Sequence, residues 1–213
     1  MNVSLTKAVL QRLPDLSVHV LVARAIRLDV LQYFQVIPPV LDPDAVENLL
    51  VQWRAQWRDF PGPWQGQGAL AQLVRMVMNQ QFQSTLPMVD MANYAALLAL
   101  CPVSGFDMAA LHGSLTLELA QSADEACQPA LFPGEPVWRD GRQQLVTRRL
   151  NAWQSPEHQL SEHSANIVFI SEQPHRAMPA PGRAFHYLQA TLTPLCDSLQ
   201  YTVLDARQLE LAC

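Results

Sequence analysis

The chain has 213 residues, of which 49 % are hydrophobic and 15 % are charged, and its formal net charge is −5. A composition this apolar excludes global disorder and is enough for one well-packed domain. The acidic balance gives no basic footprint for nucleic acid, so we expect no DNA binding. Any contact with RNA would need a local basic patch.

The four cysteines, at positions 101, 127, 196 and 213, are widely spaced and form no metal-binding or redox pair. This usage is typical of thiols in a reducing compartment. The first residues lack the apolar core of a signal peptide, and no apolar run approaches the roughly 18 residues that span a bilayer. We therefore expect a cytoplasmic protein with no membrane association, and the sequence leaves the oligomeric state open.

The N-terminal part of the chain alternates between helical and extended patterns. Residues 1–16 predict a short helix that is broken around Pro14, and the β-branched run from Ser17 to Arg24 predicts a strand buried on both faces. Asp42 followed by Pro43 is typical of a helix start. Apolar residues at helical spacing then mark one helix over 46–57 and a second over 70–77, joined by a Gly-, Pro- and Gln-rich loop. That loop lacks the pattern of a phosphate-binding loop.

The segment from Leu86 to Asp107 places polar groups inside an otherwise apolar run. We predict a helix that begins near Asp90 and stops at Cys101-Pro102, followed by a tight turn at Ser104-Gly105. Asp90 at the helix start can cap free amides, which favours a structural role over that of a general base. An ordinary capped core helix would have the same spacing.

The C-terminal part predicts strands, a hairpin and one packing helix. Residues 114–120 alternate as a strand does, and the pair Asp140-Gly141 between two extended runs is a strong hairpin signal, because glycine permits positive φ angles. Further along, a strand is predicted over 167–170, a helix over 182–199 and a final strand over 201–204. By themselves, these elements predict only a mixture of α and β structure.

Three segments resemble one family. LPMVDMANYAALLALCPVSGFD (residues 86–107) resembles the V-D-x-x-N-Y…P-x-x-x-F-D segment of the B3/B4 domain in the phenylalanyl-tRNA synthetase β subunit, and it is closer to the freestanding B3/B4-domain proteins. RRLNAWQS (148–155) resembles that family's R-R-W-N-W-R-Q-S, and SEHSAN (161–166) resembles its T-E-D-T-x-N. The match covers about residues 45–172, which implies a single B3/B4-like domain over 1–213 with a C-terminal helix and strand at 182–204.

The resemblance implies an α+β fold with B3/B4-like mixed sheets and flanking helices, and the hydrolysis of mis-acylated tRNA in trans. An editing pocket admits the wrong amino acid and positions water at its ester bond, so neutral polar groups can be sufficient. We expect this pocket between the 90–107 and 148–155 segments. Carried over onto the matching positions, the substrate-binding candidates are Asp90, Asn93, Ser104, Gly105, Asp107, Arg149, Asn151, Gln154 and Ser155.

Aminoacyl-tRNA is the expected partner, with Arg139, Arg142 and Arg148 as RNA-binding candidates beside Arg149. A non-catalytic module that binds tRNA, an amino acid or a protein partner remains the alternative. No HExxH, CxxC, GxSxG or P-loop motif occurs, so the sequence indicates no cofactor and identifies no catalytic residue. His158 and His163 are too widely spaced for one helix face, and we expect no metal site.

Overall fold

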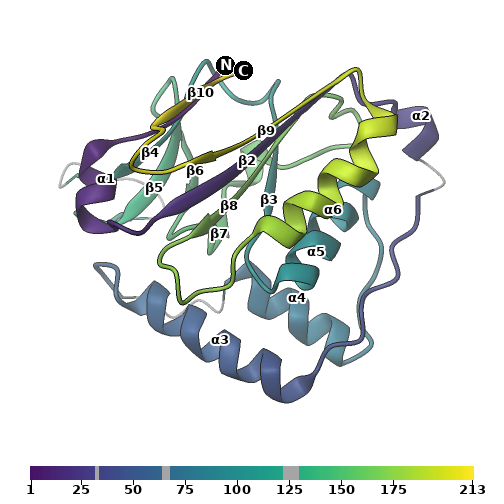
Figure 1. The fold of residues 1–213 in the computed structure, drawn as a ribbon, viewed down its shortest axis with the longest axis horizontal. Coiled ribbons are helices and arrows are strands. Elements are labelled where there is room, and N and C mark those ends of the chain that lie inside the picture. Colours follow the sequence, from purple (N-terminus) through teal and green to yellow (C-terminus); the bar gives the residue numbers. More distant parts are fainter. Residues whose placement is uncertain (32–33, 64–67, 122–129) are drawn as a thin grey trace.

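Two β-sheets with flanking helices make up the computed structural model, which describes residues 1–31, 34–63, 68–121 and 130–213 (Figure 1). The four-stranded sheet has the order β3-β8-β2-β9, formed by Ser104–Asp107, Ile167–Gln173, Ser17–Arg24 and Ser198–Leu204. All its neighbouring strands are antiparallel. The predicted α+β fold is confirmed.

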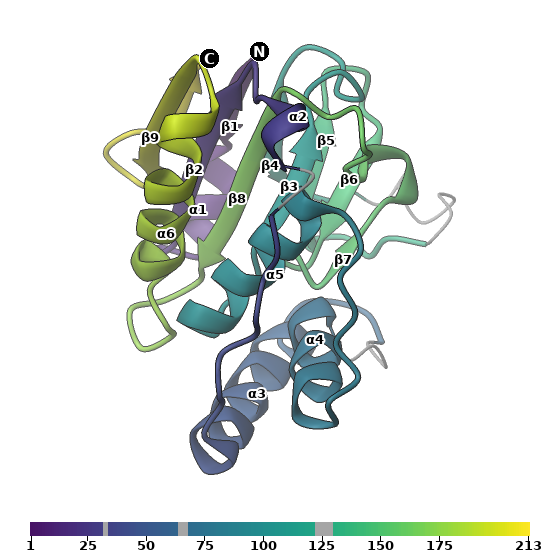
Figure 2. The same cartoon turned by 90° about the vertical axis from the view of Figure 1, so that its right-hand side faces the viewer.

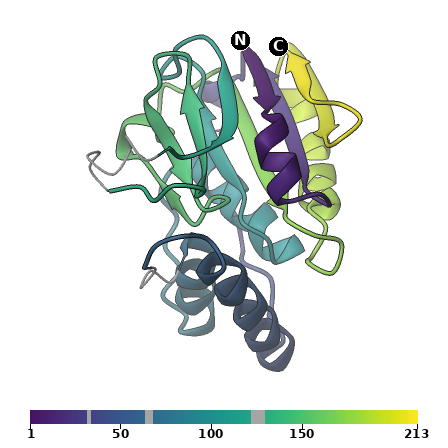
Figure 3. The same ribbon diagram turned by 90° about the vertical axis from the view of Figure 1, so that its left-hand side faces the viewer.

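The six-stranded sheet has the order β10-β1-β4-β5-β6-β7. Its strands are Glu210–Ala212, Asn2–Leu5, Leu115–Leu119, Pro136–Asp140, Leu145–Arg148 and Trp153–Gln154. The pair β1 and β4 is parallel and the other pairs are antiparallel. Because β1 pairs with β10, the two ends of the described chain lie side by side (Figure 3).

The central strand β2 contributes side chains to two separate cores. Val18, Val20 and Val22 pack toward the six-stranded sheet, whereas Leu21 and Ala23 pack among helices α5 (Pro87–Ala99) and α6 (Gly182–Leu192). Successive side chains of a strand point to opposite faces, so a strand with both faces covered is apolar throughout. This confirms the sequence prediction for Ser17–Arg24. The helices α5 and α6 lie next to each other over this sheet (Figure 1).

Helices α3 (Pro43–Arg58) and α4 (Ala69–Met78) form a unit at one end of the molecule (Figure 2). The Asp42 side chain accepts a hydrogen bond from the Asp44 amide at 3.1 Å, as the helix-start signal predicted. Trp53 and Trp57 are fully buried and stack with ring centroids 5.7 Å apart. Short helices complete the fold: α1 (Lys7–Arg12), α2 (Leu28–Leu31) and the 3₁₀ turns Pro156–His158 and Thr193–Leu195.

The predicted hairpin is present as β5 and β6, but Gly141 is needed there for a reason other than a positive φ angle. The positive φ of its connection falls on Gln143, at 64°, while the Asp140 carboxylate accepts from the amides of Arg142 and Gln144. Gly141 donates its N–H to the His112 carbonyl at 2.6 Å, and a Cβ at this position would lie 2.3 Å from that oxygen. Close backbone approach therefore requires the glycine.

Several predicted boundaries are wrong. Residues 1–16 contain strand β1 before the helix, Ser104-Gly105 lies in strand β3 instead of a turn, and α5 begins at Pro87. The α-helix predicted over 182–199 ends at Leu192, where a 3₁₀ turn takes over. Within the described ranges, no helix has the length and apolarity needed to cross a bilayer.

Candidate functional site

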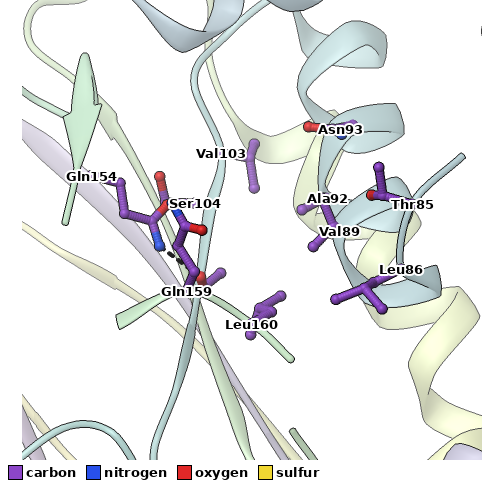
Figure 4. Close-up of a pocket in the computed structure, with 11 residues that line it drawn as sticks. Thr85, Leu86, Val89, Ala92, Asn93, Val103, Ser104, Gln154, Gln159 and Leu160 are labelled. Atoms are coloured by element: carbon purple, nitrogen blue, oxygen red, sulfur yellow. Dashed lines mark hydrogen bonds between the residues drawn. The ribbon is translucent and has the colours of Figure 1, made fainter. Parts of the chain in front are cut away.

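A cavity of about 370 Å³ opens between helix α5, strand β3 and strand β7 (Figure 4). It lies where the edge strand of the four-stranded sheet meets the edge strand of the six-stranded sheet. The structure thus places a cavity between the two segments for which one was predicted. Its lining is formed by Thr85, Leu86, Val89, Ala92, Asn93, Val103, Ser104, Gly105, Gln154, Gln159 and Leu160.

Helix α5 contributes one face to this cavity. Val89, Ala92 and Asn93 are spaced by three and four residues, so they share one side of the helix. Figure 4 shows them across the cavity from Ser104, Gln154 and Gln159. Asn93 therefore brings a neutral amide, able both to donate and to accept, into an otherwise apolar helix face.

Asp90 does not line the cavity, and its hydrogen bonds differ from the predicted cap. The carboxylate accepts from the Thr85 amide at 3.1 Å and from the hydroxyls of Ser84 and Thr85, all of which precede the helix. The side chain is 1 % exposed. It therefore holds the entry segment of α5 in place instead of capping the helix's own amides.

Strand β3 and strand β7 meet at the opposite wall of the cavity. The Gln154 side-chain amide donates to the Gly105 carbonyl at 3.2 Å, which bridges the edges of the two sheets. A Cβ on Gly105 would come within 2.9 Å of Leu160 and 3.1 Å of Phe169. Leu160 would have to shift to admit a side chain here, and with glycine in place the main chain of β3 is part of the cavity wall.

Asp107, at the end of β3, also lies outside the cavity lining. Its carboxylate accepts from the Ala109 amide at 2.8 Å and from the Ser164 hydroxyl at 2.6 Å. Ser164 belongs to the SEHSAN segment, so two of the three family-like segments meet at this pair. Ser155 is buried, and its amide donates to the Val146 carbonyl. Neither residue is placed to contact a ligand in this cavity.

Arg149, predicted to bind substrate, is an internal structural residue. Its guanidinium is fully buried and donates to the carbonyls of Trp57, at 2.7 Å, and of Pro61 and Gly62, just beyond the end of α3. Its Nε lies 3.2 Å from a carboxylate oxygen of buried Glu135. This side chain joins α3 to the β6–β7 connection and does not line the cavity.

Two further members of the predicted arginine patch, Arg139 and Arg148, are also internal. Arg148 is 7 % exposed and forms a two-point ion pair with Glu135, while Arg139 is 6 % exposed and lies 3.1 Å from Glu118. Arg142 alone of the four predicted arginines is exposed, with its guanidinium near the His112 ring. Sequence spacing did not distinguish these roles, since Glu118 and Glu135 reach the arginines only through sheet pairing.

Asn151 belongs to a buried polar cluster between the sheets and not to the cavity. It donates to the Glu172 carboxylate at 2.6 Å, and Trp138 donates its indole N–H to the other oxygen, also at 2.6 Å. Burial raises the pKa of Glu172 from 4.5 to about 7, against the opposing effect of these two donors. Arg149, Leu150 and Asn151 all adopt positive φ, near 52–57°. This strained turn aims Asn151 inward.

Four of the nine predicted binding residues therefore line the cavity: Asn93, Ser104, Gly105 and Gln154. The lining residues that sequence reasoning missed are mainly apolar, and they include Val89, Ala92 and Leu160. The helical period shared by Val89 and Asn93 could have identified the first of these. Gln159 and Leu160 carry no comparable signal, because the 3₁₀ turn before them decides where they point.

None of the family models that were compared matches this chain, and no curated protein matches it significantly. Among the described residues, no group of three or more His, Cys, Asp or Glu side chains could hold a metal ion. Cys101 is buried, and desolvation raises its pKa to about 12, which keeps it a neutral thiol. The chemistry of the cavity thus depends on amides, hydroxyls and backbone groups.

Proposed function

We propose that this cavity binds the aminoacyl group of a mis-acylated tRNA and that the chain hydrolyses the ester, as a freestanding B3/B4-type editing protein would. The observation that carries the proposal is the uncharged hydrogen-bonding lining at the junction of the two family-like segments. A cavity of about 370 Å³ is within the range of small-molecule sites. An aminoacyl side chain would pack against Val89, Ala92 and Leu160.

In this reaction a water oxygen attacks the ester carbonyl carbon, and the bond to the ribose oxygen breaks. The ribose leaves as an alcohol and takes up one proton of the attacking water. The amino acid leaves as a carboxylate, and the second proton of the water goes to solvent. Asn93, Ser104 and Gln154 have the groups to orient the water and the ester. Because tRNA esters are intrinsically labile, orientation and hydrogen bonding can supply the acceleration.

A second candidate is binding without hydrolysis. The described lining contains no ionisable side chain, hence no general base of the usual kind. The chain would then sequester an aminoacyl group or present it to another protein. Both candidates use the same cavity, so catalysis has to be measured directly.

The test is a deacylation assay of the purified protein against a panel of mischarged tRNAs. We expect at least one of them to be hydrolysed faster than in buffer, with Asn93→Ala and Gln154→Ala each reducing the rate at least tenfold. The matched controls are Asn79→Ala and Gln72→Ala, which change exposed amides, Gln72 on α4 and Asn79 directly after it. If all four variants hydrolyse the tRNA ester at the same rate, the reaction takes place outside this cavity. Tight binding of an aminoacyl-tRNA with no acceleration would establish the second candidate.

A further inference from the structure

The edge strand β3 presents main-chain groups on its side away from β8. In antiparallel pairs, opposite residues alternate between hydrogen-bonded and non-hydrogen-bonded positions. The Met108 amide donates to the Asn166 carbonyl at 2.9 Å, which continues the register Asp107↔Ile167. Bonded pairs recur at every second position, so Phe106↔Val168 and Ser104↔Ile170 are the next two. Gly105, opposite Phe169, occupies the non-bonded position between these last two pairs, so its N–H and C=O point away from the sheet.

The side-chain contact of Gln154 confirms this direction, because it reaches the Gly105 carbonyl from outside the sheet. The Gly105 N–H projects from the same edge, and none of the described residues accepts a hydrogen bond from it. Gly105 itself lines the cavity. An unpaired backbone donor at the wall of a partly enclosed cavity is costly unless water or a ligand satisfies it.

The charges around this donor favour a neutral acceptor over an anion. Asp90 and Asp107 carry the only formal charges on α5 and β3, and both are negative. No basic side chain is among the described lining residues. A free amino acid would bring its carboxylate to this donor without a counter-charge. An ester or amide carbonyl would bring a neutral oxygen, which a single N–H can satisfy.

We infer that the Gly105 main-chain N–H binds the acyl carbonyl oxygen of the ligand, so that the cavity takes aminoacyl esters and amides in preference to free amino acids. The inference rests on the proposed function and adds its recognition element. During hydrolysis the same N–H would stabilise the negative charge that develops on this oxygen. Gln154 then acts as a positioning residue, because it fixes the edge of β3 through the adjacent carbonyl.

The probes for the test are 3′-aminoacylamino-3′-deoxyadenosines, stable amide analogues of the tRNA terminus, with the corresponding free amino acids for comparison. In ¹⁵N-labelled wild-type protein, we expect the Gly105 amide proton to move downfield on titration with an amide probe, together with the side-chain amides of Asn93 and Gln154. The free amino acids should bind at least tenfold more weakly.

A matched pair of variants tests the donor. Gly105→Pro eliminates the N–H, and an edge strand tolerates proline where this N–H would face outward. Gly105→Ala retains the N–H. Both need space beside Leu160, so both are made in the Leu160→Ala background, which serves as reference. The Ala variant, which keeps the donor, is the direct comparison for the Pro variant. The Pro variant should lose about tenfold or more in affinity, as removal of a donor from a buried acceptor does.

The outcomes separate this inference from the proposed function. Movement of the Asn93 and Gln154 resonances without movement of Gly105 would overturn the inference and leave the function standing. Equal affinity of the Pro and Ala variants, or of free amino acid and amide, would also overturn it. If no cavity resonance moves with any probe, both the inference about Gly105 and the proposed function are rejected. Should the Pro variant fail to fold, the wild-type titration still decides.

Discussion

At the scale of single residues, Asp90 and Asn93 lie one turn apart on α5 yet have different surroundings. Asp90 is enclosed by donors from residues 84 and 85, whereas Asn93 is among the cavity residues. The charged residue, which a motif search would choose first for catalysis, is thus engaged in holding the backbone. The neutral residue is the one that a ligand can reach.

Asp90→Asn should therefore lower stability and leave the cavity intact. The substitution replaces a charge-assisted acceptor by a neutral one, which costs about 1–2 kcal/mol of unfolding free energy. Urea denaturation measures this loss, and the deacylation rate per folded molecule should stay within twofold of wild type. A folded Asp90→Asn protein with its hydrolysis abolished would show that the carboxylate takes part in the reaction.

Glu172 is predicted to make stability depend on pH. Its pKa is about 7 in the folded protein and 4.5 as an ordinary glutamate, so between these values the folded state holds a proton that the unfolded state has lost. This contribution to stability is complete below the lower value and is lost as the pH rises through the upper one, by up to about 3 kcal/mol.

Glu172→Gln, which resembles the protonated acid, should remove this dependence, since the Asn151 amide can turn to accept from it. Thermal unfolding at a series of pH values from 5 to 8 measures the effect. Glu162→Gln is the control, because that side chain is 75 % exposed. An unchanged pH slope in Glu172→Gln would mean that another buried group titrates there.

At the scale of elements, Arg149 connects parts of the chain that are distant in sequence. Its contacts with the carbonyls at the end of α3 and with Glu135 fix the helical unit against the β6–β7 connection. The same connection leads into β7, which carries Gln154. Helix placement and one wall of the cavity are thereby mechanically linked.

Arg149→Ala should mainly lower the stability of the fold, and any loss of activity should follow from that loss of stability. Removing one partner of a buried ion pair leaves Glu135 and several carbonyls undersatisfied, which costs about 3–5 kcal/mol. Arg142→Ala, at an exposed position, should change stability by no more than about 0.5 kcal/mol. Equilibrium unfolding in urea compares the two. A loss below about 1 kcal/mol for Arg149→Ala would contradict the structural role.

The elements that could be predicted from sequence are those with a strong local signal. The apolar run of β2, the capped start of α3 and the β5–β6 hairpin are each encoded within a short stretch. Strands β1, β3, β7 and β10 have two to four residues, and each exists because a distant segment offers a hydrogen-bonding edge. The cavity wall between Gly105 and Gln154 is set by that long-range pairing. Motif matching found these two residues, but it gave no role to their backbone.

At the scale of the whole molecule, charge argues against strong attraction to nucleic acid. The chain carries a formal charge of −5, and two arginines of the predicted patch are neutralised inside the protein by Glu118 and Glu135. Long-range steering of a polyanion is then weak or unfavourable. If tRNA binds, the recognition of its aminoacyl end in the cavity has to contribute most of the affinity.

Arg142 is the residue on which any phosphate contact near the hairpin would depend. Each arginine that meets a phosphate contributes close to one unit, about 0.7–0.9, to the slope of log affinity against log salt. We therefore expect a shallow slope for wild type and a slope lower by about that amount for Arg142→Ala. Arg183→Ala, at an exposed position of α6, is the control and should not change the slope. The measurement is the affinity for an aminoacylated tRNA at several salt concentrations.

A steep slope in wild type that Arg142→Ala leaves unchanged would locate the tRNA on another face of the protein. Binding without any salt dependence would mean that the aminoacyl end alone is recognised.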